Sequence, residues 1–220
     1  MSDKYYQSPI ILEPFNYIKI QQYIHHSGIN EDAQYNKDTQ NFEVKSHVYI
    51  NLNSKTYKLD EYHFHIPSEH IVNGEKHEAE IHYVFIEHTE DDHPIKNSIL
   101  QLPITHKKIH SNICNCCESS DSVNNYYNEL NLDIVVIGRT IRNNCISTRS
   151  KQKLKNMQVR IPHTFYQYDG TLTTGAFLPV RWLIGANPIY LDIEQVAVVA
   201  KPARPIQDLN SRIILFSKSK

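Results

Sequence analysis

The sequence predicts a mainly β protein that folds as a single domain, with short helices only at its periphery. Short runs of β-branched and aromatic residues recur along the 220 residues, separated by polar turn residues, which is typical of strands. With 40% apolar residues, the chain can bury one sizeable core. Only six glycines are present, which excludes a collagen-like or low-complexity chain. One domain over residues 1–220 is therefore expected.

The individual elements follow from local patterns. The clearest strand signals lie at Val48–Leu52, Ile81–Ile86, Ile134–Ile137 and Val196–Val199. Only two stretches have helical length and character, roughly Ser122–Leu130 and Ser150–Met157, and both are short and polar on one side. Residues from about 88 to 131 are rich in Asn, Ser, His and Cys and lack periodicity, which predicts a long insertion between two sheet segments.

Charge and hydropathy exclude several partners. The 23 basic and 24 acidic residues leave a net charge of -1, so no overall positive field attracts nucleic acid. No apolar run approaches the roughly 18 residues of a membrane span, and the first residues lack the apolar region of a signal peptide. We expect a cytoplasmic or other intracellular protein. The many Asn, Ile, Lys and Tyr residues fit a microbe or a large virus, and a viral source leaves a virion location open.

The cysteines do not form a disulfide framework. They stand at Cys114, Cys116, Cys117 and Cys145. Because adjacent cysteines pair with each other only under strain, reduced thiols are the expected state. A second metal site is the alternative, since His106 and His110 precede this cluster, although the spacing matches no zinc template well.

Three other histidines are predicted to converge on one ion. Residues two apart in a strand point to the same face, so His63 and His65 project together. Downstream, Asn73-Gly74 is the preferred sequence for a two-residue hairpin turn, which places His82 opposite His65 and diagonal to His63. Three neutral imidazoles on adjacent strands form an open tetrahedral zinc site whose fourth position is left for water.

The alternative is that these are ordinary strand histidines, which any one of them alone would be more often than a ligand. The joint geometry favours the metal site, and Glu80 on the face of His82 supplies a hydrogen-bond partner behind that ligand. Pro67 and the Ser68-Glu69 pair are able to interrupt the hairpin, so the pairing of the two strands is a prediction.

At these residues the sequence resembles the alpha class of carbonic anhydrases. Five blocks occur in the family's order: Gln7–Ile10, His63–His70, Glu80–His82, Gly170–Thr174 and Arg204–Arg212. The Pro-Ser-Glu-His form within the second block is more similar to bacterial and plant members than to vertebrate ones. The resemblance implies a large, twisted, mostly antiparallel central β-sheet.

The resemblance also implies a role for each matching residue. The zinc ligands match His63, His65 and His82, the carboxylate behind the third ligand matches Glu80, and Glu61 stands where the family often has a glutamine behind the first. Thr173 matches the threonine that accepts a hydrogen bond from zinc-bound hydroxide, and Glu69 the glutamate that directs that threonine's own proton. The residues matching the substrate site are Thr174, Val84, Val136, Leu172 and Trp182.

The implied function is the zinc-dependent, reversible hydration of carbon dioxide to bicarbonate and a proton, by attack of zinc-bound hydroxide. Such a lyase is expected to bind sulfonamide-type inhibitors. The alternative is a noncatalytic, carbonic anhydrase-related domain for surface adhesion, glycosaminoglycan or partner binding. Those relatives typically lack at least one of the three histidines, so the enzyme is favoured. The oligomeric state is left open.

Two departures from the family's pattern concern activity. After Thr174 the family usually has a pair of prolines, whereas Gly175 and Ala176 stand here, so Thr173 is expected to be held more loosely and activity to be lower. The proton shuttle is ambiguous, because one alignment places His47 at the family's histidine and another places Ser46 there.

Overall fold

The computed structural model describes residues 6–14, 17–20, 22, 24–28, 33–45, 47–88, 132–144 and 154–218. The strands are β1 (Ile11–Leu12), β2 (Ile18–Ile20), β3 (His25–Ser27), β4 (Gln34–Asn36), β5 (Asn41–Glu43), β6 (Tyr49–Leu52), β7 (Lys55–Ile66), β8 (Ile71–Val72), β9 (Ala79–Glu87), β10 (Ile134–Asn143), β11 (Thr164–Thr171), β12 (Pro179–Gly185), β13 (Ile189–Leu191), β14 (Lys201–Pro202) and β15 (Leu215–Lys218). The described residues also form the 3-10 turn η3 (Leu154–Asn156) and the helix α2 (Ile193–Ala197).

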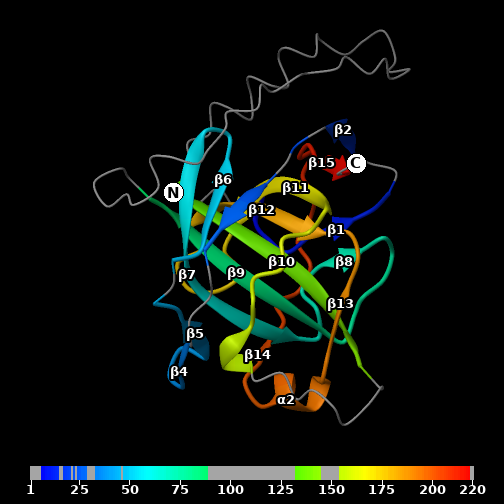
Figure 1. Ribbon diagram of the computed structural model, residues 1–220. Helices are drawn as coiled ribbons and strands as arrows, with labels where there is room; N and C mark the ends of the chain where they lie inside the picture. Colours follow the sequence, from blue (N-terminus) through cyan, green and yellow to red (C-terminus); the bar gives the residue numbers. More distant parts are fainter. Residues whose placement is uncertain are drawn as a thin grey trace, which may run out of the picture. The chain divides into compact units, whose positions relative to one another are not determined.

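One large sheet contains nearly all of these strands. Its order is β2-β15-β11-β12-β10-β9-β7-β5-β4, with β6 and β14 pairing with β7, β13 with β10, and β3 with β6. The long neighbours β7, β9 and β10 pair antiparallel and cross its middle (Figure 1). Parallel pairs occur as well, such as β10 with β12, so the sheet is mixed but mostly antiparallel. The predicted fold class is confirmed.

The alternation of side chains along β9 separates two apolar cores. Ile81, Tyr83 and Phe85 are fully buried in the larger core on one face of the sheet. Val84 belongs to a second cluster on the opposite face, which we call the site-side core and which also contains Trp182. Because successive strand residues point to opposite faces, His82 lies on the face of Val84. The central strands therefore place polar residues such as His82 on a face of the sheet that is otherwise covered by apolar side chains.

The connection between β7 and β9 departs from the predicted hairpin. The two-residue turn forms, since Val72 and Glu75 exchange both backbone hydrogen bonds at 3.0 Å around Asn73-Gly74. Nearer the strands, however, His63 is opposite His82, and His65 is opposite Glu80. The predicted pairing of His65 with His82 is wrong by two residues, because the chain after β7 carries two more residues than the returning chain. The shift is even, so all three histidines still share one face.

The predicted strand at Val196–Val199 is also wrong, because the helix α2 occupies this region. Its cap residue Asp192 accepts a hydrogen bond from the backbone N–H of Glu194 and another from the side chain of Gln195. Aspartate followed three residues later by glutamine is a helix-start signal that the β-branched residues obscured.

The other helix predictions are only partly covered. Of Ser150–Met157, the structure describes the 3-10 turn η3. The Ser122–Leu130 prediction, the insertion at about 88–131, the four cysteines, His106 and His110 lie outside the described residues. No helix among the described residues is long and apolar enough to cross a membrane.

Candidate metal centre

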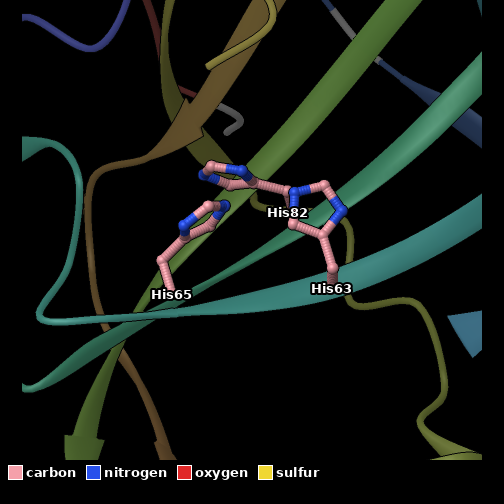
Figure 2. A group of neighbouring side chains, drawn as sticks. All are labelled: His63, His65 and His82. Atoms are coloured by element: carbon pink, nitrogen blue, oxygen red, sulfur yellow. The ribbon is translucent and has the colours of Figure 1, made fainter. Parts of the chain in front are cut away.

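Three imidazoles converge on the site-side face of the sheet. His63 and His65 come from β7 and His82 from β9, and Figure 2 shows their rings turned toward one another. The ring centroids are 5.0 Å apart for His63 and His65, 5.3 Å for His63 and His82, and 4.8 Å for His65 and His82. One nitrogen from each ring lies within 4.8 Å of the other two, a spacing that could hold one metal ion.

Each ring is oriented by a hydrogen bond from its other nitrogen. His63 Nδ1 is 3.1 Å from Glu61 Oε1, His65 Nδ1 is 3.3 Å from the Pro202 carbonyl, and His82 Nε2 is 3.0 Å from Glu80 Oε1. Because carboxylate and carbonyl oxygens only accept, the bonded nitrogen of each neutral ring carries the proton. The lone pairs then lie on Nε2 of His63 and His65 and on Nδ1 of His82, as metal ligation requires.

Burial keeps two of these rings neutral. All three histidines are at most 4% exposed. Burial, together with the neighbouring His82, lowers the pKa of His63 to about 4 although Glu61 opposes the shift, and burial and the neighbouring histidines lower that of His65 to about 2. Moreover, the buried His65 Nε2 has no hydrogen-bond partner among the described residues. An unpartnered nitrogen facing two further imidazoles is expensive unless a cation binds there, so the donor set fits Zn²⁺.

Glu80 connects the metal centre to the β7–β9 connection. Its Oε2 accepts the backbone N–H of Glu69 at 2.9 Å and of His70 at 2.8 Å. Its Oε1 is 2.8 Å from His70 Nδ1, in addition to its contact with His82. Burial by itself would raise the pKa of Glu80, but His70 and His82 hold it well below the usual value. A charged carboxylate with four donors fixes the orientation of the His82 ring.

A glycine on the next strand leaves room for this contact. Gly138 on β10 is directly opposite His82. A Cβ atom at this position would lie 2.9 Å from Glu80 Oε1 and 2.6 Å from the Ile184 side chain. Since real Cβ atoms are essentially never so close to a neighbour, any larger residue would displace the end of the Ile184 side chain and either Glu80 or the strand. The glycine is thus part of the support for His82.

Glu69 lies beside the same rings. Its Oε1 accepts the backbone N–H of Arg204 at 2.8 Å and is 3.3 Å from His65 Nδ1. Its Oε2 is buried 4.0 Å from His82 Nδ1 and has no hydrogen-bond partner in the part of the chain that the structure describes. Thr173 is buried, at 6% exposure, but no hydrogen bond among the described residues joins it to Glu69. The pairing of these two side chains remains a prediction.

The residues predicted to form the apolar wall are neighbours in the sheet, and their contact with substrate remains a prediction. Val84 is opposite Val136, and Val136 is in turn opposite Trp182, on three adjacent strands. Leu172 packs against the same site-side core. The indole ring of Trp182 is 4.8 Å from the His82 ring, so the wall begins at the metal centre.

Of the remaining predicted site residues, Glu61 contacts the His63 ring, and the others make no described contact with the histidines. Glu61 Oε2 accepts a hydrogen bond from Asn41, whose own side-chain oxygen accepts one from Lys201. His47 is exposed just before β6, and Thr174 is exposed beside Thr173. Ser46 lies outside the described residues. No described contact joins His47 or Thr174 to the histidines, so their roles stay predictions.

Several residues that support the histidine cluster were not predicted from the sequence. His70 bridges Glu80 and the Tyr168 hydroxyl, which is 2.7 Å from its Nε2. Its place beside Glu69 in the motif was a usable signal. In contrast, Pro202 and Arg204 act through backbone atoms, and no side-chain pattern indicates a backbone contact across the fold.

Comparison with known proteins supports the motif resemblance. A family model described as eukaryotic-type carbonic anhydrase matches residues 2–218. The carbonic anhydrase of Neisseria gonorrhoeae is 25% identical over an alignment of 174 residues, and the match covers 76% of this chain and 58% of that protein. The chain thus spans less than two thirds of this relative's length.

Two solved structures share the fold. The alpha-carbonic anhydrase of Thermovibrio ammonificans, in complex with the inhibitor sulfanilamide, gives a TM-score of 0.62 at 19% identity and covers 96% of this chain and 87% of its own. Dioscorin complexed with ascorbate gives a TM-score of 0.67 at 19% identity, with 98% and 87% covered. Since the family model extends over almost the whole sequence, and the fold agrees with it, the chain belongs to the eukaryotic-type, or alpha-class, carbonic anhydrase family.

Proposed function

We propose that this chain catalyses the zinc-dependent, reversible hydration of carbon dioxide to bicarbonate and a proton. The observation that carries the proposal is the convergence of three buried imidazole nitrogens beside the apolar residues of the site-side core. Membership of the carbonic anhydrase family supports the same reaction.

His63, His65 and His82 would hold the metal. When bound by three neutral imidazoles, Zn²⁺ lowers the pKa of a coordinated water to about 7 and so supplies a nucleophile at neutral pH. The chain's contribution is to keep the rings neutral and correctly oriented. Burial lowers the pKa of His63 and His65, and the acceptors Glu61 and Glu80 each fix the direction of one ring.

Thr173 would orient the nucleophile, and Glu69 would orient Thr173. A threonine hydroxyl accepts a hydrogen bond with a defined direction only when its own proton is donated elsewhere. Glu69 is suited to take that proton, because its Oε1 accepts the N–H of Arg204 while its buried Oε2 has no partner within the described ranges. One free acceptor oxygen next to the rings is what this arrangement needs.

Carbon dioxide has no charge and no hydrogen-bond donor, so an apolar surface is enough to hold it loosely. Val84, which is 7% exposed, would present such a surface on the face of His82, and the fully buried Val136 and Trp182 lie behind it. The charged product binds this surface less well than the substrate, which favours its release into water.

The decisive experiment measures three quantities on one purified sample: zinc content, the rate of carbon dioxide hydration, and inhibition by sulfanilamide. We expect one zinc per chain and sulfanilamide-sensitive hydration. A His163→Ala variant, which changes an exposed histidine, is the control and should behave like the parent. Stoichiometric zinc without hydration would refute the enzyme and favour the noncatalytic binding domain.

A further inference from the structure

The loop that carries Thr173 is closed on itself and contains a strained residue. The backbone N–H of Leu172 donates to the carbonyl of Leu178 at 2.9 Å, which closes residues 172–178 into a compact loop. Within it, Gly175 and Phe177 have φ angles of 69° and 50°. Glycine adopts this left-handed region without cost, but a bulky residue such as phenylalanine does not. Something outside the loop must therefore stabilise Phe177 in this conformation.

The ring of Phe177 packs against the guanidinium group of Arg204, which lies outside the loop. The guanidinium carbon is 4.3 Å from the ring centroid, well inside the roughly 6 Å limit of a cation–π contact. Phe177 is only partly buried, and its neighbour Leu178 is 48% exposed. Contacts with the apolar core are thus limited at this end of the loop, which makes the ring's contact with Arg204 its principal specific attachment among the described residues.

Arg204 is itself fixed at three points. Its backbone N–H donates to Glu69 Oε1 at 2.8 Å, and its guanidinium group donates to the Ser8 carbonyl at 2.8 Å and to the side chain of Gln7. A guanidinium held by two acceptors presents a flat, immobile face. The same residue therefore touches the carboxylate beside the metal centre and the loop that carries Thr173.

We propose that Phe177 is a positioning residue: by resting on Arg204, it fixes the loop 172–178, and with it Thr173, relative to Glu69. The contact takes over the restraint that the family's usual prolines supply, since Gly175 and Ala176 leave the loop free to move. These contacts alone support the fixing of the loop by Phe177. The effect of the loop on catalysis rests on the proposed function.

Two substitutions separate the ring's electrostatic face from its bulk. Phe177→Leu keeps an apolar side chain of similar size at the strained position but removes the aromatic face, whereas Phe177→Tyr keeps the face. Tyr190→Leu, which removes a 56% exposed ring elsewhere, is the matched control. The first measurement is amide hydrogen exchange of the Leu172 N–H in the zinc-free protein, because this bond closes the loop.

In Phe177→Leu we expect exchange at Leu172 to accelerate about fivefold to tenfold, as the loss of one cation–π contact implies. The Arg204 N–H, held by Glu69, should exchange at the parent rate and serves as an internal reference. Phe177→Tyr and Tyr190→Leu should match the parent at both positions. Unchanged exchange at Leu172 in Phe177→Leu, or equal acceleration in Phe177→Tyr, would overturn the proposal.

The second measurement is hydration by the zinc-loaded variants. We expect kcat of Phe177→Leu to fall by about the same factor, with zinc content and KM unchanged, and Phe177→Tyr to restore it. Accelerated exchange at Leu172 with an unchanged kcat would overturn the catalytic part. If the parent itself lacks hydration activity, the proposed function fails, while the exchange experiment still decides the structural part.

Discussion

Removal of zinc should make the stability of this protein strongly dependent on pH between 7 and 5. In the zinc-free chain, burial lowers the pKa of His63 to about 4 and of His65 to about 2, and it lowers that of His77 as well. An unfolded histidine has a pKa near 6.5 and binds a proton over this range, whereas His63 and His65 stay largely neutral in the folded chain. The unfolded state therefore takes up more protons, and stability falls as pH falls.

The magnitude follows from the linkage relation. A histidine that takes up a proton only in the unfolded state lowers the free energy of unfolding by about 2 kcal/mol between pH 7 and pH 5. His63 and His65 together therefore lower it by about 4 kcal/mol. His77 adds to the loss in the same direction. The stability that these neutral histidines contribute is fully present above about pH 7. It falls as the pH is lowered, until the pH reaches the pKa values of the folded state. Because a whole domain is stable by only about 5–15 kcal/mol, the effect is a large fraction of the total.

Urea unfolding after dialysis against a chelator measures this loss, with the fluorescence of the only tryptophan, the fully buried Trp182, as the signal. His65→Gln removes one of the two titrating rings and should halve the loss assigned to the pair, whatever its effect on absolute stability. His25→Gln changes an exposed histidine and should leave the pH dependence unchanged. An unfolding free energy that stays level from pH 7 to 5 would refute the reasoning.

Four further predictions concern single residues. His82→Ala should abolish stoichiometric zinc binding, seen by metal analysis, because two imidazoles leave the site incomplete; retained zinc would exclude His82 as a ligand. Gly138→Ala should weaken zinc binding about tenfold in a chelator competition, because the added methyl group displaces Glu80 from His82; unchanged affinity would show that the strand absorbs the methyl. Thr173→Ala should cut hydration about 100-fold while zinc stays bound; full activity would place the threonine outside the reaction. His47→Ala should slow turnover in dilute buffer, with rescue by imidazole, if His47 exports the proton; parental rates at every buffer concentration would exclude it.

Local signals in the sequence predicted the face of each ligand but not the register between the strands. The alternation of His63 and His65 and the Asn73-Gly74 turn were correct, because each depends on neighbouring residues only. The pairing of His65 with His82 was not, since Pro67 lacks the N–H of a regular ladder and the chain leaves the hairpin after β7. That departure has a use: it turns the backbone N–H groups of Glu69 and His70 toward Glu80.

Other parts of the site depend on contacts across long sequence separations. The wall residues Val84, Val136 and Trp182 could be named from the family resemblance, and the register brings them together. The restraint on the 172–178 loop could not be predicted from the sequence. The missing prolines indicate a looser loop, and nothing in the sequence shows that the ring of Phe177 packs on Arg204. A sequence without its fold does not show which cation lies over which ring.

The position of the three ligands along the chain bears on how the site is assembled during synthesis. All of them occur between residues 63 and 82, on two antiparallel neighbours, whereas the Pro202 carbonyl that orients His65 is made 120 residues after His82. Contacts between nearby residues form faster than those that close long loops. A nascent chain thus exposes all three histidines of the proposed zinc site long before it has the Pro202 carbonyl that orients His65. We expect metal binding to precede catalytic activity, because activity also requires residues from the C-terminal third of the chain.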